Sequence, residues 1–266
     1  MEGPLQPERP LGPIPTFGSV QWVGPRHISG DDGCLYDTVA DTLSGLGWTA
    51  LTMVRGRHQR GDDPGVLRST VLHLGADARR WAQWVLADEP FLLGGLPIGW
   101  QVSARASAEG MAHWAAYFTR EVPGEAVSAF LLALDATEQP TATLGGPDLV
   151  VSATTANGWI PDADEPAAAA DPMYVSHLSL GEVPPLIQDG DPRSAVPEAD
   201  GPGLQGWQAW SEPTAGGPYL WAASFSSSVP HDLVAAFAAA LSSTAPVLRR
   251  RLPESTRDRL LRAPAG

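Results

Sequence analysis

The chain has 266 residues, of which 43% are hydrophobic, enough for one large domain or two small domains with real cores, and disorder throughout is excluded. The net charge of −13 disfavours nonspecific binding of the body of the protein to nucleic acid or to an anionic membrane. No apolar run approaches eighteen residues and the N-terminal segment lacks a hydrophobic leader, so we expect a cytoplasmic protein with neither a spanning helix nor a secretory signal.

The first predicted elements are a helix and three strands. Four apolar side chains ahead of Gly47, a suitable helix stop, recur at helical spacing: Leu35, Val39, Leu43 and Leu46. Three strand-like segments follow: TALTMVR, STVLHLG and WAQWVLA.

A hairpin and a second helix are predicted next, over residues 99–134. Trp100 and Val102 alternate with polar residues, Trp114, Ala116 and Phe118 recur at every second position as in a strand with one buried face, and a glycine-containing turn separates the two runs. Pro123 then introduces a segment with apolar residues three and four positions apart, which predicts a helix. We therefore expect this helix to pack on the face of the hairpin that carries the large apolar residues.

The hairpin and helix recur later in the chain. Shifting the sequence by 107 positions aligns 99–134 with 206–241 without a gap, and 16 of 36 positions are identical. The identities include six pairs of large or turn-forming residues: Gly99/Gly206, Trp100/Trp207, Trp114/Trp221, Phe118/Phe225, Pro123/Pro230 and Phe130/Phe237. Weaker similarity upstream relates Gly47-Trp48 to Gly158-Trp159. The sequence therefore predicts a tandem duplication.

Four segments follow from this division of the chain. They are a Pro-rich N-terminal segment (1–26), a first unit (27–138), a second unit (139–248) and an Arg-rich tail (249–266). We expect the second unit to lack an opening helix, to contain a strand at DLVVSATT, and to carry two long acidic loops at 160–171 and 182–205. The predicted fold class is α+β, with tandem units, each an antiparallel sheet backed by a C-terminal helix, in a pseudo-twofold arrangement.

The duplicated pattern resembles a known family. Gly-Trp, followed by Trp-x-Ala-x-Phe-x-x-x-x-Pro-x-x-x-Val-x-x-Phe-x-x-x-Leu, is similar to the uncharacterised actinobacterial family called domain of unknown function three-one-seven, and it matches best at 114–134 and 221–241. The resemblance implies an intracellular actinobacterial protein with paired α+β units. It implies no catalytic residues. Val122 and Val229 depart from the family, which often has a hydroxylated residue before the helix proline.

Few residues suggest catalysis. All 17 basic residues are arginine, and the absence of lysine excludes Schiff-base enzymes and the lysine of a phosphate-binding loop. Cys34, the single cysteine, excludes an internal disulfide and a zinc site of several thiolates. His27 and two acidic residues precede Cys34 closely, a combination that can activate a thiol, but a structural loop cysteine is the favoured interpretation.

The histidines and tryptophans are interpreted as structural. No histidine pair has the spacing of a helical metal site, and we expect His73 and His177, which are predicted to lie in corresponding strands of the two units, to be structural. The four repeated tryptophans should lie in the core. Four others have no such counterpart and are candidates for exposed platforms that stack on bases or sugars: Trp22, Trp81, Trp84 and Trp210. The sequence indicates no cofactor and no metal, and it leaves open whether the protein binds a small-molecule ligand.

The tail supplies the candidate partner-binding residues, because it carries six arginines against two acids whereas 139–248 carries one arginine against twelve acids. These residues are Arg249, Arg250, Arg251, Arg257, Arg259 and Arg262. Three interpretations remain: a solvated terminus, docking on the acidic second unit, or a contact with nucleic acid or a partner. We expect removal of 249–266 to leave the fold intact.

The leading functional hypothesis is a non-enzymatic intracellular binding or adaptor protein that receives a protein partner at the groove or edge between the units. One alternative is a nucleic-acid-associated regulator that acts through the Arg-rich tail. Another is an uncharacterised enzyme that uses Cys34 and His27.

Overall fold

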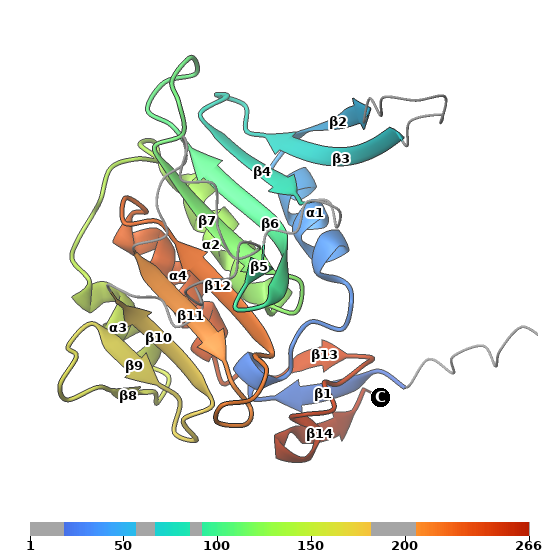
Figure 1. Ribbon diagram of the computed structural model, residues 1–266, viewed down its shortest axis with the longest axis vertical. Coiled ribbons are helices and arrows are strands. Elements are labelled where there is room, and N and C mark those ends of the chain that lie inside the picture. Colours follow the sequence, from blue (N-terminus) through green and yellow to red (C-terminus); the bar gives the residue numbers. More distant parts are fainter. Residues whose placement is uncertain (1–18, 57–66, 86–91, 182–205, 266) are drawn as a thin grey trace, which may run out of the picture.

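The computed structural model describes residues 19–56, 67–85, 92–181 and 206–265 (Figure 1). These residues form an eleven-stranded antiparallel sheet with four helices, and a separate three-stranded sheet. The α+β fold class is confirmed. No helix among the described residues combines the length and the apolar character that a membrane span requires.

The two units have the same order of elements. In the first unit they are α1 (Leu35–Gly45), β2 (Thr49–Gly56), β3 (Leu67–Leu74), β4 (Arg80–Trp84), β5 (Leu92–Leu93), β6 (Leu96–Ala104), β7 (Trp114–Thr119) and α2 (Gly124–Ala136). In the second unit they are α3 (Asp148–Thr155), β8 (Ile160–Pro161), β9 (Ala168–Ala170), β10 (Ser176–Leu180), β11 (Trp207–Ser211), β12 (Trp221–Phe225) and α4 (His231–Ser242). Only the short β5, which pairs with β6, has no counterpart among the described elements.

The strand order of the large sheet is β2-β3-β4-β6-β7-β12-β11-β10-β9-β8, so the units meet at β7 and β12. Both predicted hairpins and the helices behind them are confirmed. The helices line up on one face of the sheet, with α1 against α2, α2 against α4 and α4 against α3 (Figure 1). Because β7 and β12 pair with each other, the edge between the units that was expected to receive a partner is already occupied.

The junction between β7 and β12 has a regular register. Phe118 lies opposite Ala223, Tyr117 opposite Ser224, and Ala116 opposite Phe225. Two side-chain hydroxyl groups extend the pairing of the two strands at its ends. The Ala115 N–H donates to Ser226 Oγ (3.1 Å), and the Ala222 N–H donates to Thr119 Oγ1 (2.9 Å). Ala115 and Ala222 are equivalent in the repeat, and so are Thr119 and Ser226.

Four fully buried phenylalanines form the centre of the core between the sheet and the helices: Phe118, Phe130, Phe225 and Phe237. Within the units, ring centroids lie 5.6 Å apart for Phe118 and Phe130 and 5.2 Å apart for Phe225 and Phe237. Across the units, Phe118 to Phe237 and Phe130 to Phe225 both measure 5.7 Å. The four repeated tryptophans are also buried, as predicted. The units thus share one core.

The second unit is more complete than the sequence predicted. The segment DLVVSATT, expected to be a strand, is the helix α3, so the second unit does have an opening helix. The acidic loop at 160–171 contains β8 and β9. The other acidic loop, 182–205, lies outside the described residues.

The small sheet joins the two ends of the described chain. Its central strand is β1 (Gln21–Gly24), with β13 (Val247–Arg249) on one side and β14 (Leu261–Pro264) on the other. Thr256 and Leu260 from the tail are buried, and Thr256 Oγ1 donates to the carbonyl oxygen of Ile28 (2.7 Å). The interpretation of the tail as a solvated terminus was therefore wrong, because Thr256 is hydrogen-bonded to Ile28 and Leu260 packs in a buried cluster with Ile28 and Val175.

Candidate functional site

The structure separates the six candidate arginines of the tail into three groups. Arg249 is buried. Four exposed arginines line one hollow in the surface beside the small sheet: Arg250, Arg251, Arg257 and Arg262. Arg259, on the 3₁₀ turn η2 (Arg257–Arg259), is exposed but does not line it. We call this feature the arginine hollow. It gives a defined geometry to the binding surface that the sequence predicted in the tail.

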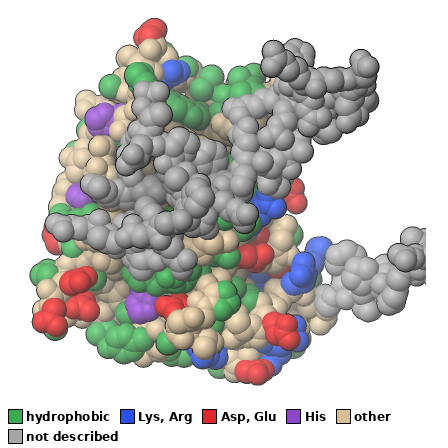
Figure 2. Space-filling view, in the orientation of Figure 1, with side chains coloured by type: hydrophobic (Ala, Val, Ile, Leu, Met, Phe, Trp, Pro, Cys, Tyr) green, Lys and Arg blue, Asp and Glu red, His purple; other side chains and the backbone are tan. Residues whose placement is uncertain are grey.

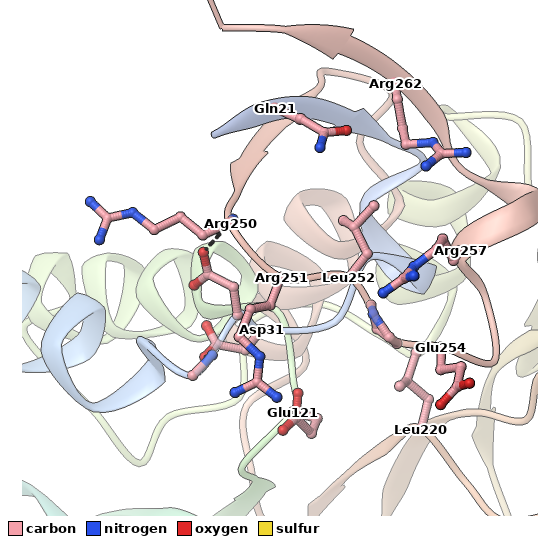
Figure 3. A pocket seen from close by; sticks show the side chains of 13 residues that line it. Gln21, Asp31, Glu121, Leu220, Arg250, Arg251, Leu252, Glu254, Arg257 and Arg262 are labelled. Atoms are coloured by element: carbon pink, nitrogen blue, oxygen red, sulfur yellow. Dashed lines mark hydrogen bonds between the residues drawn. The ribbon is translucent and has the colours of Figure 1, made fainter. Parts of the chain in front are cut away.

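The arginine hollow has a volume of about 640 Å³. Residues from β1, from the loop before α1, from the loop before α2 and from the tail line it. In Figure 3, the Arg251 side chain extends toward Glu121, Arg257 and Arg262 lie on the other side of Leu252, and the Arg250 guanidinium extends away from the rest. The surface in this region carries basic and acidic side chains side by side (Figure 2).

Arg249 anchors the tail beneath the arginine hollow. Its guanidinium donates to both carboxylate oxygens of Glu125, at 2.7 Å each, and its Nε donates to the carbonyl oxygen of Gly30 (2.9 Å). Burial raises the pKa of Glu125, but the hydrogen bonds and charge of Arg249 outweigh this and hold it below its ordinary value. Glu125 belongs to α2, so this ion pair ties the tail to the first unit, while Leu260 of the tail packs with Val175 of the second unit, so the tail contacts both units.

Four carboxyl groups share the arginine hollow with the arginines: Asp31, Asp32, Glu121 and Glu254. Asp31 is 6% exposed and accepts hydrogen bonds from the N–H groups of Gly33 (2.9 Å) and Leu35 (2.6 Å), which orders the start of α1. Burial raises the pKa of Asp31 to about 6. Burial also raises the pKa of Glu121, while the charge of Arg251 opposes that rise. Burial thus raises the pKa of both Asp31 and Glu121 above its ordinary value.

Asp31→Asn should remove part of the pH dependence of stability. In the native protein Asp31 holds its proton up to a pH of about 6, whereas its ordinary pKa is 3.8. The native state therefore binds more protons than the unfolded chain over this interval. From Asp31 alone, the unfolding free energy should fall by on the order of 2 kcal/mol as the pH rises from about 4 to about 6, and then stay level. Urea unfolding across this range measures the decline.

The matched control is Asp258→Asn, at an exposed position on η2. This variant should keep the decline in stability that Asp31→Asn loses. Identical pH profiles for Asp31→Asn and the unaltered protein would show that Asp31 ionises normally in the folded state.

The hypothesis of a Cys34 nucleophile receives no support from the site. His27 Nδ1 is hydrogen-bonded to Ser176 Oγ (2.9 Å), and burial lowers the pKa of His27 to about 4. A hydrogen bond with Asp32, burial and neighbouring carboxylates raise the pKa of Cys34. Because a nucleophilic cysteine needs the opposite shift, these surroundings disfavour a thiolate.

His73 and His177 do not lie in corresponding strands of the two units. His73 is in β3 and His177 in β10, whereas the strand order matches β3 with β9 and β10 with β4. His177 stacks on Trp210 with ring centroids 5.1 Å apart, and His73 is buried beside Trp100. Within the described ranges, no three His, Cys, Asp or Glu side chains are grouped so that they could hold a metal ion.

The four tryptophans without a counterpart fall into two kinds. Trp22 on β1 is 41% exposed. Trp81, Trp84 and Trp210 are half-buried, and the guanidinium carbons of Arg105 and Arg120 lie 5.3 and 5.6 Å from the ring centroids of Trp81 and Trp84. Trp22 is therefore the one with most surface for a partner.

Sequence reasoning missed the acidic half of the arginine hollow. Asp31 and Asp32 were considered only as neighbours of Cys34, and nothing near Glu121 in the sequence points to a site. The tail arginines and these carboxyl groups are far apart in the chain, and only the pairing of β1 with β13 and β14 brings them together. A charge count by segment could identify the tail but not the residues that face it.

Comparison with known proteins identifies the repeated unit. The family model described as SPDY, domain of unknown function (DUF317), matches residues 76–141 and 190–247. Among the described residues, these matches include both hairpins and the helices α2 and α4. No curated protein and no solved structure matches the chain. The chain thus matches this family model in two segments that together cover somewhat less than half of its residues, which is consistent with two tandem copies of the domain.

Proposed function

We propose that the protein is a non-enzymatic binding module whose arginine hollow takes a segment of a partner protein that carries acidic side chains. One observation carries the proposal: Arg251, Arg257 and Arg262 line the same hollow, and none of them forms an ion pair with a described residue. A guanidinium group binds a carboxylate with two parallel hydrogen bonds, which makes an acidic side chain the natural ligand.

The mixture of charges favours a polypeptide over a nucleic acid. Asp31, Asp32, Glu121 and Glu254 would repel a uniform row of phosphates, and the chain as a whole carries a net charge of −13. A polypeptide can place carboxylates against the arginines and neutral or basic groups against the acidic wall. Such matching of opposite charges gives specificity to protein interfaces.

The outer face of the small sheet, opposite the face on which Gln21 and Arg262 line the arginine hollow, carries exposed apolar side chains. Trp22 lies opposite Leu248 in the register, and these side chains are 41% and 43% exposed, while Leu261 is 80% exposed. Their chain neighbours Gln21 and Arg262 line the hollow. Tryptophan and arginine are enriched among the residues that dominate protein interfaces, so this combination supports a protein partner.

The test is fluorescence anisotropy with a labelled peptide in which glutamates flank a central leucine, and a labelled DNA duplex as the competing probe. Replacement of both Arg257 and Arg262 by alanine should weaken peptide binding about tenfold or more, because two charge-assisted contacts are lost. Arg259→Ala, on the same turn but outside the lining, is the control and should change binding less than about twofold.

The proposal fails if the double variant binds the peptide as well as the unaltered protein does. If the DNA duplex binds more tightly than the peptide, and that affinity falls steeply with salt and with the same two replacements, the nucleic-acid-associated regulator is the correct function.

We also infer that the two units are related by a pseudo-twofold axis that passes between Tyr117 and Ser224. These two residues are equivalent in the repeat and lie opposite each other. The exchanged partners on either side of them support the axis, as do the matched contacts at 5.7 Å between phenylalanines of different units. An isologous contact of this kind is what a copy of one surface makes with itself.

A further inference from the structure

Strand β2 ends the large sheet on one side and pairs, among the described residues, only with β3 (Figure 1). It has eight residues, and its register with β3 runs from Thr49 to Gly56 without an interruption. The backbone N–H and C=O groups on its outer side are therefore a straight template for a further strand.

The other outer strands of the described residues lack this property. β8, the strand at the opposite end of the large sheet, has two residues and includes Pro161. In the small sheet, β13 has three residues and β14 ends at Pro264. Short length and proline are common ways in which proteins prevent a sheet edge from pairing with another chain, and β2 has neither.

The side chains of β2 also favour a contact. Val54 is 62% exposed and Leu51 is 43% exposed, although they lie on opposite faces of the strand. The strand contains no acidic residue, even though the chain carries a net charge of −13. An added strand would thus cover apolar surface on both faces without meeting the negative charge of the chain at the point of contact.

We propose that β2 is the interface through which two copies of this chain associate, by antiparallel pairing of β2 with β2 of the second copy. A twofold axis perpendicular to the sheet places each residue opposite one on the same face. In the register centred on Thr52, Leu51 faces Met53 of the other copy and Ala50 faces Val54, while the two copies of Arg55 fall at opposite ends. Thr52 faces its own equivalent, a favourable pair across antiparallel strands.

The strand is thus complementary to itself, which is the reason for assigning a second copy rather than an unrelated peptide. The chain already joins its own units in this way, since β7 and β12 pair antiparallel with equivalent residues opposite each other. The same kind of contact at β2 would join two eleven-stranded sheets into one continuous sheet.

The mass of the full chain in solution tests the proposal. Multi-angle light scattering after gel filtration, loaded at about 100 μM, a concentration at which a micromolar dimer is filled, should give twice 28.0 kDa for the unaltered protein. Val54→Lys should raise the dissociation constant at least tenfold, because it places a charge against Ala50 of the other copy, and a dilution series down to about 1 μM should therefore give a lower mean mass for this variant than for the unaltered protein. Ile160→Lys, 41% exposed on the opposite edge, is the matched control and should remain a dimer. Circular dichroism melting verifies that both variants are folded.

A second measurement tests the register. In a Cys34→Ser background, Thr52→Cys should be joined to its equivalent in the second copy by a short bismaleimide linker, whereas Ile160→Cys should not. A monomer mass for the unaltered protein, or a folded Val54→Lys variant whose mean mass equals that of the unaltered protein throughout the dilution series, would overturn the proposal. Efficient linking at Ile160→Cys instead of Thr52→Cys would place the contact at the other edge and would overturn it as well.

Discussion

Phe237→Ala should lower the free energy of unfolding by about 3–5 kcal/mol, the usual cost of emptying an aromatic core site. Phe237 is fully buried and touches Phe225 of its own unit and Phe118 of the other. Phe130→Ala should cost a similar amount, because its contacts with Phe118 and Phe225 are the counterparts of these. Chemical denaturation with a two-state fit measures both losses.

Leu132→Ala on α2 is the control for this pair, since Leu132 is 52% exposed, and it should cost less than about 1 kcal/mol. The two phenylalanine losses should not add, because both side chains pack against Phe118 and Phe225 and would leave one shared cavity. Losses below about 1 kcal/mol for either phenylalanine would show that the units do not depend on a common core.

Arg249→Ala should destabilise the protein by about 3–5 kcal/mol, the range observed when one partner of a buried ion pair is removed. Its side chain is 6% exposed, and its loss leaves Glu125 and the carbonyl oxygen of Gly30 without their donor. Removal of 249–266 should be at least as harmful, because Thr256 and Leu260 would be lost as well. This reverses the expectation from the sequence that the tail can be removed without consequence.

Arg250→Ala is the matched control, since Arg250 is the next residue but is exposed, and it should change stability by less than about 0.5 kcal/mol. Replacement of both Arg249 and Glu125 by methionine should recover part of the loss, because no charge is then left unpaired. Equal stability of Arg249→Ala and the unaltered protein would mean that the tail is held by its strands alone.

The sequence predicted those elements whose apolar residues have a clear period. In the hairpins, Trp114 and Phe118 recur at alternate positions and are wholly buried, although Ala115 and Tyr117 on the other face are buried too, and the following helix starts one residue after Pro123. Because both copies carry the same pattern, the sequence alone excludes chance agreement. The buried face and the helix behind it could therefore be assigned residue by residue.

Helix α3 was wrongly predicted as a strand because its amino-acid composition favours a strand, whereas the residues at its two ends favour a helix. Val150, Val151 and the threonines are β-branched, which favours strands. The boundaries indicate a helix, since Pro147 and Asp148 stand at its start and Gly158, with φ of 88°, follows its end. Burial of Val150 against the core decides the outcome, and only tertiary packing supplies that.

The candidate site was predictable only in part. Arginine content identified the tail, but the same content suggested a solvated segment and hid the packing of Val247 and Leu260. The pairing of β13 and β14 with β1 depends on contacts between the two ends of the described chain, and no local pattern encodes such contacts. For the same reason, the sequence could not show that Asp31, Asp32 and Glu121 line the arginine hollow.

The small sheet also sets an order of assembly during protein synthesis. Ile28 and Thr256, which share a hydrogen bond, are 228 positions apart, and Gly30 and Arg249 are 219 positions apart. Contacts of such separation carry a large closure entropy unless the intervening chain is already compact. Both hairpins and their helices leave the ribosome earlier, so the large sheet can form before β13 and β14, the partners of β1, have been synthesised. The arginine hollow is then the last of these features to appear, and a nascent chain acquires it only after β14 has left the ribosome.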